Sequence, residues 1–120
     1  MNILNQEEVL EIYKSVGALL EGHFILSSGL HSKMYLQSAL IFSDPKIGEK
    51  LCSSLAYKVS NQINIDDIDI IVSPAMGGVI VGYEMSKQLN RKNIFAERKE
   101  GVFTIRRGFE IKKGQNVLVV

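Results

Sequence analysis

A run of β-branched residues at 68–72, followed at once by a glycine-containing turn, constrains the fold of this chain most. The run Ile68-Asp69-Ile70-Ile71-Val72 is typical of a buried strand in a parallel sheet. The turn Ser73-Pro74-Ala75-Met76-Gly77-Gly78 then leads into a helix predicted over 77–90 and a second strand over 93–98. Strand, crossover helix and strand form a right-handed unit with parallel strands. The sequence therefore predicts an α/β fold.

The segment before this unit supplies a helix and two short strands. Asn5 and Glu8 have the spacing of a capping box, which predicts a helix from there to about Leu20. Strands are predicted at 24–26 and at 34–42, the second from alternating apolar residues. We expect this part of the chain to precede the sheet as a separate region.

The rest of the chain continues the α/β alternation. Pro45 predicts the first turn of a helix whose apolar stripe contains Cys52, which we therefore interpret as an inert core residue. Further strands are predicted at 103–105 and 117–120. We divide the chain into an amino-terminal helix and adjoining segment, 1–42, and an α/β core with a parallel sheet flanked by helices, 43–120.

Composition excludes several classes of protein. The formal net charge of +1 argues against a general nucleic-acid or membrane-surface binder. No apolar run approaches the roughly 20 residues that a membrane helix needs, and we see no secretory signal. One cysteine cannot form an internal disulfide, and two histidines cannot form a Cys/His metal cluster, so no metal ligand is predicted. These features favour the reducing cytoplasm.

The turn at 73–78 has the properties of an anion site. Glycine lets the backbone approach a ligand closely, and the unpaired N–H groups at a helix start face an anion. Its spacing matches neither the dinucleotide fingerprint nor the P-loop. A tight turn with no ligand remains the alternative.

Two other segments contain groups that bind polar ligands. Residues 24–35 gather hydroxyls, a glycine and aromatic rings that suit a flat polar ring, or else form a serine-rich hairpin. His31 is interpreted as a surface or structural histidine. Arg98 and Lys99 end a predicted strand, where α/β folds usually bind ligands, and their charges suit a diphosphate. The alternative for 97–108 is a solvated hairpin with alternating charges.

Together these segments resemble the orotate phosphoribosyltransferase family. The resemblance spans nearly the whole chain and is carried, in order, by Gly22-His23-Phe24-Ile25-Leu26-Ser27-Ser28-Gly29-Leu30-His31-Ser32, Pro74-Ala75-Met76-Gly77-Gly78, Phe95-Ala96-Glu97-Arg98 and Arg106-Arg107-Gly108-Phe109. It implies the type I phosphoribosyltransferase fold, a parallel sheet flanked by helices with an amino-terminal hood.

The resemblance also implies a reaction. Members join orotate to the ribose of phosphoribosyl diphosphate (PRPP), forming orotidine monophosphate and diphosphate during pyrimidine (UMP) biosynthesis. Mg²⁺ is bound through PRPP. The transition state is oxocarbenium-like, so positioning and neutralisation of the leaving diphosphate carry the catalysis. A cytoplasmic homodimer with shared active sites is implied.

By position, the resemblance assigns site residues. The PRPP and diphosphate contacts would be Ala75, Met76, Gly77, Gly78, Arg98 and Lys99, with a cis peptide at Ala75-Met76. The orotate contacts would be Ser28, Gly29, Ser32 and Tyr35 in the hood. Lys99 opens the segment that resembles the mobile loop and is the candidate catalytic residue.

The family's PRPP motif, an acidic pair before a threonine- and glycine-rich turn, is expected directly after Val120. We therefore interpret the chain as an amino-terminal fragment, incomplete at its carboxyl end and inactive alone. Two alternatives stay open: a purine-type phosphoribosyltransferase, and a non-catalytic regulatory module of the same fold.

Overall fold

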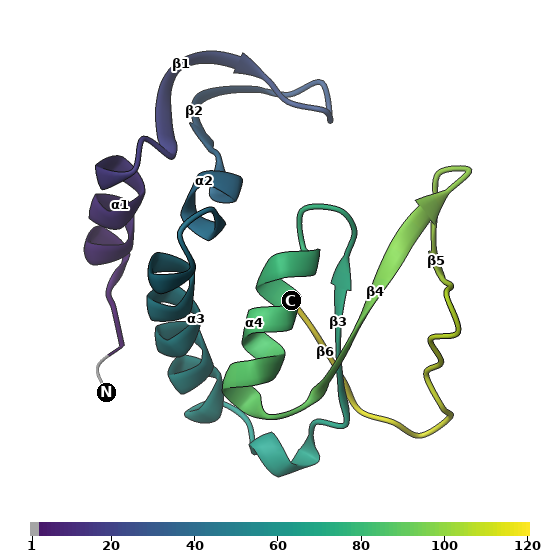
Figure 1. The fold of residues 1–120 in the computed structure, drawn as a ribbon. Helices are drawn as coiled ribbons and strands as arrows, with labels where there is room; N and C mark the ends of the chain where they lie inside the picture. Colours follow the sequence, from purple (N-terminus) through teal and green to yellow (C-terminus); the bar gives the residue numbers. More distant parts are fainter. Residues whose placement is uncertain (1–2) are drawn as a thin grey trace. The chain divides into compact units, whose positions relative to one another are not determined.

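The computed structural model describes residues 3–120, which form two compact units (Figure 1). One unit comprises residues 4–51, and the other comprises residues 52–120 with Ile3. The division falls inside helix α3 (Pro45–Ser60).

Helix α1 (Gln6–Ser15) begins where the sequence predicts. The Asn5 side chain accepts from the Glu8 N–H and the Asn5 N–H donates to Glu8 Oε2, each at 2.8 Å, so the capping box is confirmed. The helix does not reach Leu20, because Gly17 adopts φ +72° just after it. The Ala18 N–H then donates to Tyr13 O (2.8 Å) and the Gly17 N–H to Lys14 O (3.1 Å), the paired bonds that end a helix at a left-handed glycine.

A hairpin follows, formed by antiparallel strands β1 (Leu19–Ile25) and β2 (His31–Leu36). The predicted strand over 34–42 is wrong beyond Leu36, because Ser38–Phe42 forms the short helix α2. Four apolar residues after one serine are too few to separate a strand period from a helix period, and here the helix buries Ile41 completely. The Gln37 N–H, bonded to Ala18 O at 2.7 Å, marks the end of the hairpin.

The second unit contains a four-stranded sheet in the order β5-β4-β3-β6. Strand β3 (Ile70–Pro74) pairs in parallel with both β4 (Lys92–Lys99) and β6 (Val117–Val119). Strand β5 (Val102–Ile105) returns antiparallel to β4. The predicted α/β sheet is confirmed, with one antiparallel edge strand added to its parallel part.

Helix α4 (Val79–Leu89) connects β3 to β4 and packs on both strands. Ile71 on β3 and Met85 on α4 are fully buried between them. Cys52 on α3 is 2% exposed, so its predicted place in the core is confirmed. Helix α4 ends at Asn90, whose left-handed φ of 55° turns the chain into β4.

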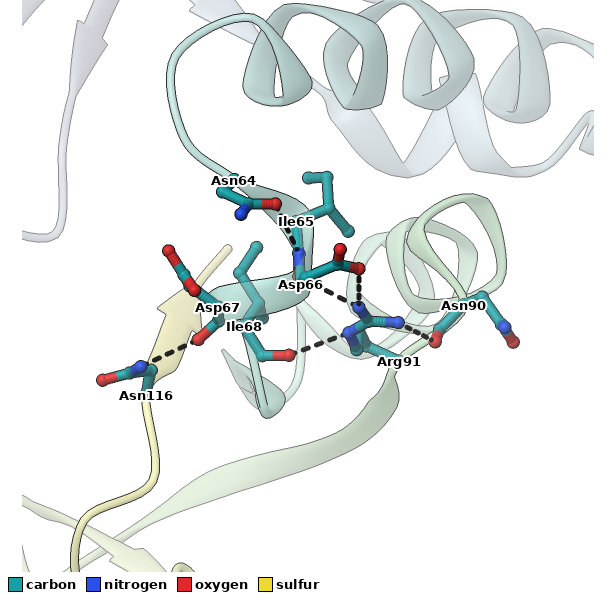
Figure 2. A network of polar contacts seen from close by, with 8 residues as sticks. All are labelled: Asn64, Ile65, Asp66, Asp67, Ile68, Asn90, Arg91 and Asn116. Atoms are coloured by element: carbon teal, nitrogen blue, oxygen red, sulfur yellow. Dashed lines mark hydrogen bonds and ion pairs between the residues drawn. The ribbon is translucent and has the colours of Figure 1, made fainter.

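Arg91 joins two backbone segments through three carbonyl groups near the amino-terminal ends of strands β3 and β4 (Figure 2). Its Nε donates to Ile68 O at 2.8 Å and its Nη2 to Ile65 O at 3.0 Å. Ile65 opens the short 3-10 helix η1 (Ile65–Asp67), which leads into β3. The Nη1 atom of Arg91 donates to Asn90 O at 2.8 Å. The guanidinium therefore fixes the end of α4 against the start of β3.

Candidate functional site

The loop between β3 and α4 is held by its own backbone. The Ala75 N–H donates to Ala96 O of β4 at 2.7 Å, and the Gly78 N–H donates back to Pro74 O at 2.8 Å. The Ala75–Met76 peptide is cis, as the resemblance implies. Within residues 3–120, the N–H groups of Met76 and Gly77 have no backbone acceptor. An anion in front of the loop would find both groups available.

The two glycines of the loop, Gly77 and Gly78, differ in what surrounds them. A Cβ atom on Gly78 would lie 2.6 Å from Pro74 O, so this position requires glycine for the chain to turn back on itself. A Cβ atom on Gly77 would meet nothing within 4 Å, so Gly77 borders open space. The side chain of Met76 also faces outward, with 88% of it exposed. The loop therefore presents an open backbone surface that a small ligand can approach.

Two cationic residues lie at the end of the neighbouring strand, β4. Pro74 pairs with Ala96 in the parallel register, so the loop and the end of β4 lie at the same edge of the sheet. Arg98 and Lys99 are the last two residues of β4, and both are exposed. The Arg98 guanidinium stacks over the Phe103 ring, 4.6 Å from its centroid. Stacking orders the guanidinium while leaving its N–H edge free to donate.

An ion pair sits beside these cations and was missed by sequence reasoning. Arg107 Nε and Nη2 contact the two carboxylate oxygens of Glu97, the latter at 3.1 Å. The hydrogen bond from Arg107 lowers the pKa of Glu97, and the same bond raises the pKa of Arg107. Arg107 has a left-handed φ of 62°, which no pattern in the sequence predicts. Of the two adjacent arginines, Arg106 and Arg107, it is therefore Arg107 whose ion pair with Glu97 holds the segment 105–109 against β4.

The predicted orotate contacts lie on the β1–β2 hairpin, in the other unit. Ser28 and Gly29 form the turn 26–30, where the Gly29 N–H donates to Leu26 O (2.8 Å) and Gly29 has φ +85°. The Ser28 hydroxyl accepts from the Leu30 N–H at 3.3 Å. The Tyr35 ring lies 5.8 Å from the ring of Phe24 on the paired strand. Ser28 is therefore committed to its turn, while Tyr35 is part of an aromatic pair.

A surface cavity of about 780 Å³ opens on this hairpin. Of the four predicted orotate contacts, all within the described residues, only Ser32 lines it. Ser32 Oγ donates to Met34 O at 2.6 Å. The cavity is lined by Glu21, Gly22, His23, His31, Ser32, Lys33 and Met34. Sequence reasoning did not single out His23. Its position across the 26–30 turn from His31 is the feature that could have indicated the pair.

The fold is that of type I phosphoribosyltransferases. It is similar to the structure of Leishmania donovani UMP synthase, with a TM-score of 0.74 and 21% identity over 93% of this chain and 24% of that one. Orotate phosphoribosyltransferase from Aeropyrum pernix gives a TM-score of 0.67 at 19% identity, over 92% of this chain and 62% of that one. An adenine phosphoribosyltransferase gives 0.59 at 18% identity, over 90% of this chain and 69% of that one. At these identities, the fold alone is shared.

Sequence comparison is more specific than the fold. The chain is homologous over nearly its whole length to orotate phosphoribosyltransferases. It is 51% identical to that of Maricaulis maris and 50% identical to that of a Thermoanaerobacter species, each over 117 residues and 98% of this chain. It spans 60% of the length of both relatives. No protein-family model matches the chain.

Two kinds of feature are absent from residues 3–120. Within 3–120, no helix is both long and apolar enough to cross a membrane. In the same part of the chain, no three side chains of His, Cys, Asp or Glu come together in a way that could hold a metal ion.

Proposed function

We propose that this chain provides the diphosphate loop and the orotate hood of an orotate phosphoribosyltransferase. The observation that carries the proposal is the identity of about 50% to enzymes of that name, extending over 98% of the chain. The open loop at 75–78 supports it, because the loop lies at the same end of the sheet as Arg98 and Lys99, so a diphosphate would find both N–H donors and cations there.

In the reaction, a ring nitrogen of orotate gives up its proton and forms a bond to the anomeric carbon of PRPP as the bond to the diphosphate oxygen breaks. The products are orotidine monophosphate and diphosphate. Negative charge grows on the departing diphosphate, so donors in place before the reaction lower the barrier. We assign this role to the backbone N–H groups of Met76 and Gly77, and to Arg98 and Lys99 at the end of β4. Ala75 and Gly78 shape the loop.

Lys99 is the proposed mobile catalytic cation. It pairs with Val102 at the tip of the β4–β5 hairpin, where Glu100 and Gly101 both adopt left-handed φ angles. Lys99 is exposed at this tip. An ammonium on a flexible stem can follow the diphosphate as charge develops, and a homodimer would let it serve the partner's site.

The orotate ring is assigned to the hairpin that carries Ser28, Gly29, Ser32 and Tyr35. Hydroxyl and backbone groups suit the ring's carbonyl and carboxylate oxygens, and Tyr35 offers an aromatic face. Mg²⁺ would arrive on the diphosphate oxygens of PRPP and offset their charge. We place the reaction in the cytoplasm.

The first test is titration of the 120-residue chain by NMR. Diphosphate should shift the amide signals of 75–78, 98 and 99, and orotate should shift those of 28–35. Gly77→Ala fills the open space in front of the loop without touching its fold, so it should weaken diphosphate binding at least about tenfold. Ile80→Ala, exposed on α4 next to the loop, is the matched control and should bind normally.

The second test concerns the substrate. A chimera in which this chain replaces the matching part of the Maricaulis maris enzyme should form orotidine monophosphate from orotate and PRPP. It should not accept adenine. A folded chimera that consumes PRPP with adenine and ignores orotate would overturn the assignment in favour of a purine-type enzyme. A folded chimera that binds neither substrate would favour a non-catalytic module.

A further inference from the structure

Two histidines meet across the β1–β2 hairpin. His23 Nε2 lies 2.6 Å from His31 Nδ1, and their ring centroids are 4.8 Å apart. We propose that these two nitrogens form a binding site for a borderline transition-metal ion of the Zn²⁺, Ni²⁺ or Cu²⁺ type. The proposal does not depend on the proposed reaction, although Ser32, which we assign to orotate, lines the cavity beside the pair.

The hairpin register brings the imidazoles together. Ile25 pairs directly with His31, and residues two apart on a strand share a face, so His23 lies diagonally across from His31. The register shifts between Glu21 and Phe24, which places His23 in an irregular stretch of β1. A local irregularity re-aims the side chain it carries. The two imidazoles meet in the fold, although the two residues are eight positions apart in the chain.

The contact geometry suits a shared ion. A hydrogen bond between two neutral imidazoles needs one N–H and one bare nitrogen, so the pair holds one proton between them. Neutral imidazole nitrogen is a preferred ligand of Zn²⁺, Cu²⁺ and Ni²⁺. Two bonds of roughly 2.05 Å at a tetrahedral angle set the nitrogens about 3.4 Å apart. Both side chains are exposed, so small rotations suffice to open the pair around an ion.

The surroundings leave room and impose no net charge. The cavity of about 780 Å³ beside the pair can hold the water ligands that complete the coordination. Glu21 and Lys33 also line it, and their opposite charges offset one another. Since no third protein ligand is gathered in the described chain, the site relies on two imidazoles. Such a nitrogen pair discriminates against Mg²⁺, which prefers oxygen ligands.

Metal binding would have a structural effect on the hairpin. His23 lies on β1 and His31 opens β2, so an ion held by both links the two strands on either side of the turn 26–30. That turn contains Ser28 and Gly29, and their geometry would be restrained by the link. Because an ion that binds the folded chain stabilises it by mass action, the melting temperature should rise with its concentration.

The chain offers a clean test, because His23 and His31 are its only histidines. Isothermal titration of the chain with Zn²⁺ should give one site, and electron paramagnetic resonance of the Cu²⁺ form should show two imidazole nitrogens. His23→Gln and His31→Gln should each weaken Zn²⁺ binding at least about tenfold and reduce the Cu²⁺ spectrum to one nitrogen. Cys52→Ser should bind as the unaltered chain does, and excess Mg²⁺ should not displace Zn²⁺.

Three results would overturn the proposal. One is full Zn²⁺ affinity in either glutamine variant, which would assign the ion to other groups. Another is a Cu²⁺ spectrum with one nitrogen in the unaltered chain, which would mean that the imidazoles bind independently. The third is displacement by equimolar Mg²⁺, which would indicate an oxygen site. Circular dichroism of both variants checks that the chain still folds.

Discussion

Gly82 of helix α4 lies so close to Ser73 of strand β3 that a Cβ atom on Gly82 would stand 2.2 Å from Ser73 Oγ. Ser73 is 1% exposed and lies two residues before the loop 75–78 that we assign to diphosphate. The close approach of helix and strand therefore sets the position of the loop. Neither the Ser73 hydroxyl nor Asn93 Oδ1, which also faces Gly82, has a hydrogen-bond partner within the described residues.

Gly82→Ala should lower the free energy of unfolding by about 1–3 kcal/mol, because the added methyl forces the helix away from buried atoms. The variant should also weaken diphosphate binding, since the loop moves with the helix. Chemical denaturation and the NMR titration described above measure the two effects. Tyr83→Ala, next to it but 70% exposed, is the control and should change stability by less than about 0.5 kcal/mol. Equal stability of Gly82→Ala and the control would contradict the packing argument.

Arg91→Ala should cost about 2 kcal/mol of stability, because the hydrogen bonds from a charged group to the carbonyls of Ile65 and Ile68 are lost. Arg91→Lys should recover only part of this, since one ammonium cannot reproduce the guanidinium fork. Urea denaturation measures both variants, with the exposed Lys92→Ala as the control. If lysine restored full stability, charge alone, without the fork, would explain the contribution of Arg91.

The ion pair of Glu97 and Arg107 predicts a dependence on acid. The pKa of Glu97 is lowered in the folded chain from its ordinary value of 4.5, so its contribution to stability is complete above that pH. The contribution is lost as the pH falls through the lowered value. Glu97→Gln should therefore be less stable than the unaltered chain at pH 7, and the difference should shrink below pH 4.5. Thermal melts from pH 7 to pH 3 test this. A difference that stays constant over the range would exclude the ion pair as its source.

Cys52 predicts a loss of stability in base. Burial raises the pKa of its thiol from 9.0 to about 11, with the negative charge of Glu84 adding to the shift. The pKa of the thiol is higher in the folded chain than in the unfolded chain. The contribution of the neutral thiol to stability is therefore complete below pH 9 and is lost as the pH rises toward 11. Cys52→Ala should show a smaller decline in stability between pH 8 and pH 10.5. Thiol titration should find Cys52 slow to react until the chain unfolds.

Much of the fold could be read locally. The capping box at Asn5 and Glu8 depends on residues three apart. The buried strand before the glycine turn depends on a continuous run, which predicts it at 68–72, and the structure places it two residues later, at 70–74. The helix end at Gly17 was missed because a left-handed glycine competes with an apolar pattern that continues to Leu20. Helix α2 was missed because five residues give too short a sample to separate a period of two from one of 3.6.

The sequence by itself determined the α/β alternation, the loop at 75–78 and the relationship to orotate phosphoribosyltransferases, because each is written in contiguous residues. Only the tertiary structure decided which side chains meet. Arg107 faces Glu97 from the left-handed turn that follows β5, and His23 faces His31 diagonally across the hairpin. Gly82 must be glycine because β3 lies against it. Such contacts depend on backbone paths between residues distant in the chain, and a local pattern does not contain those paths.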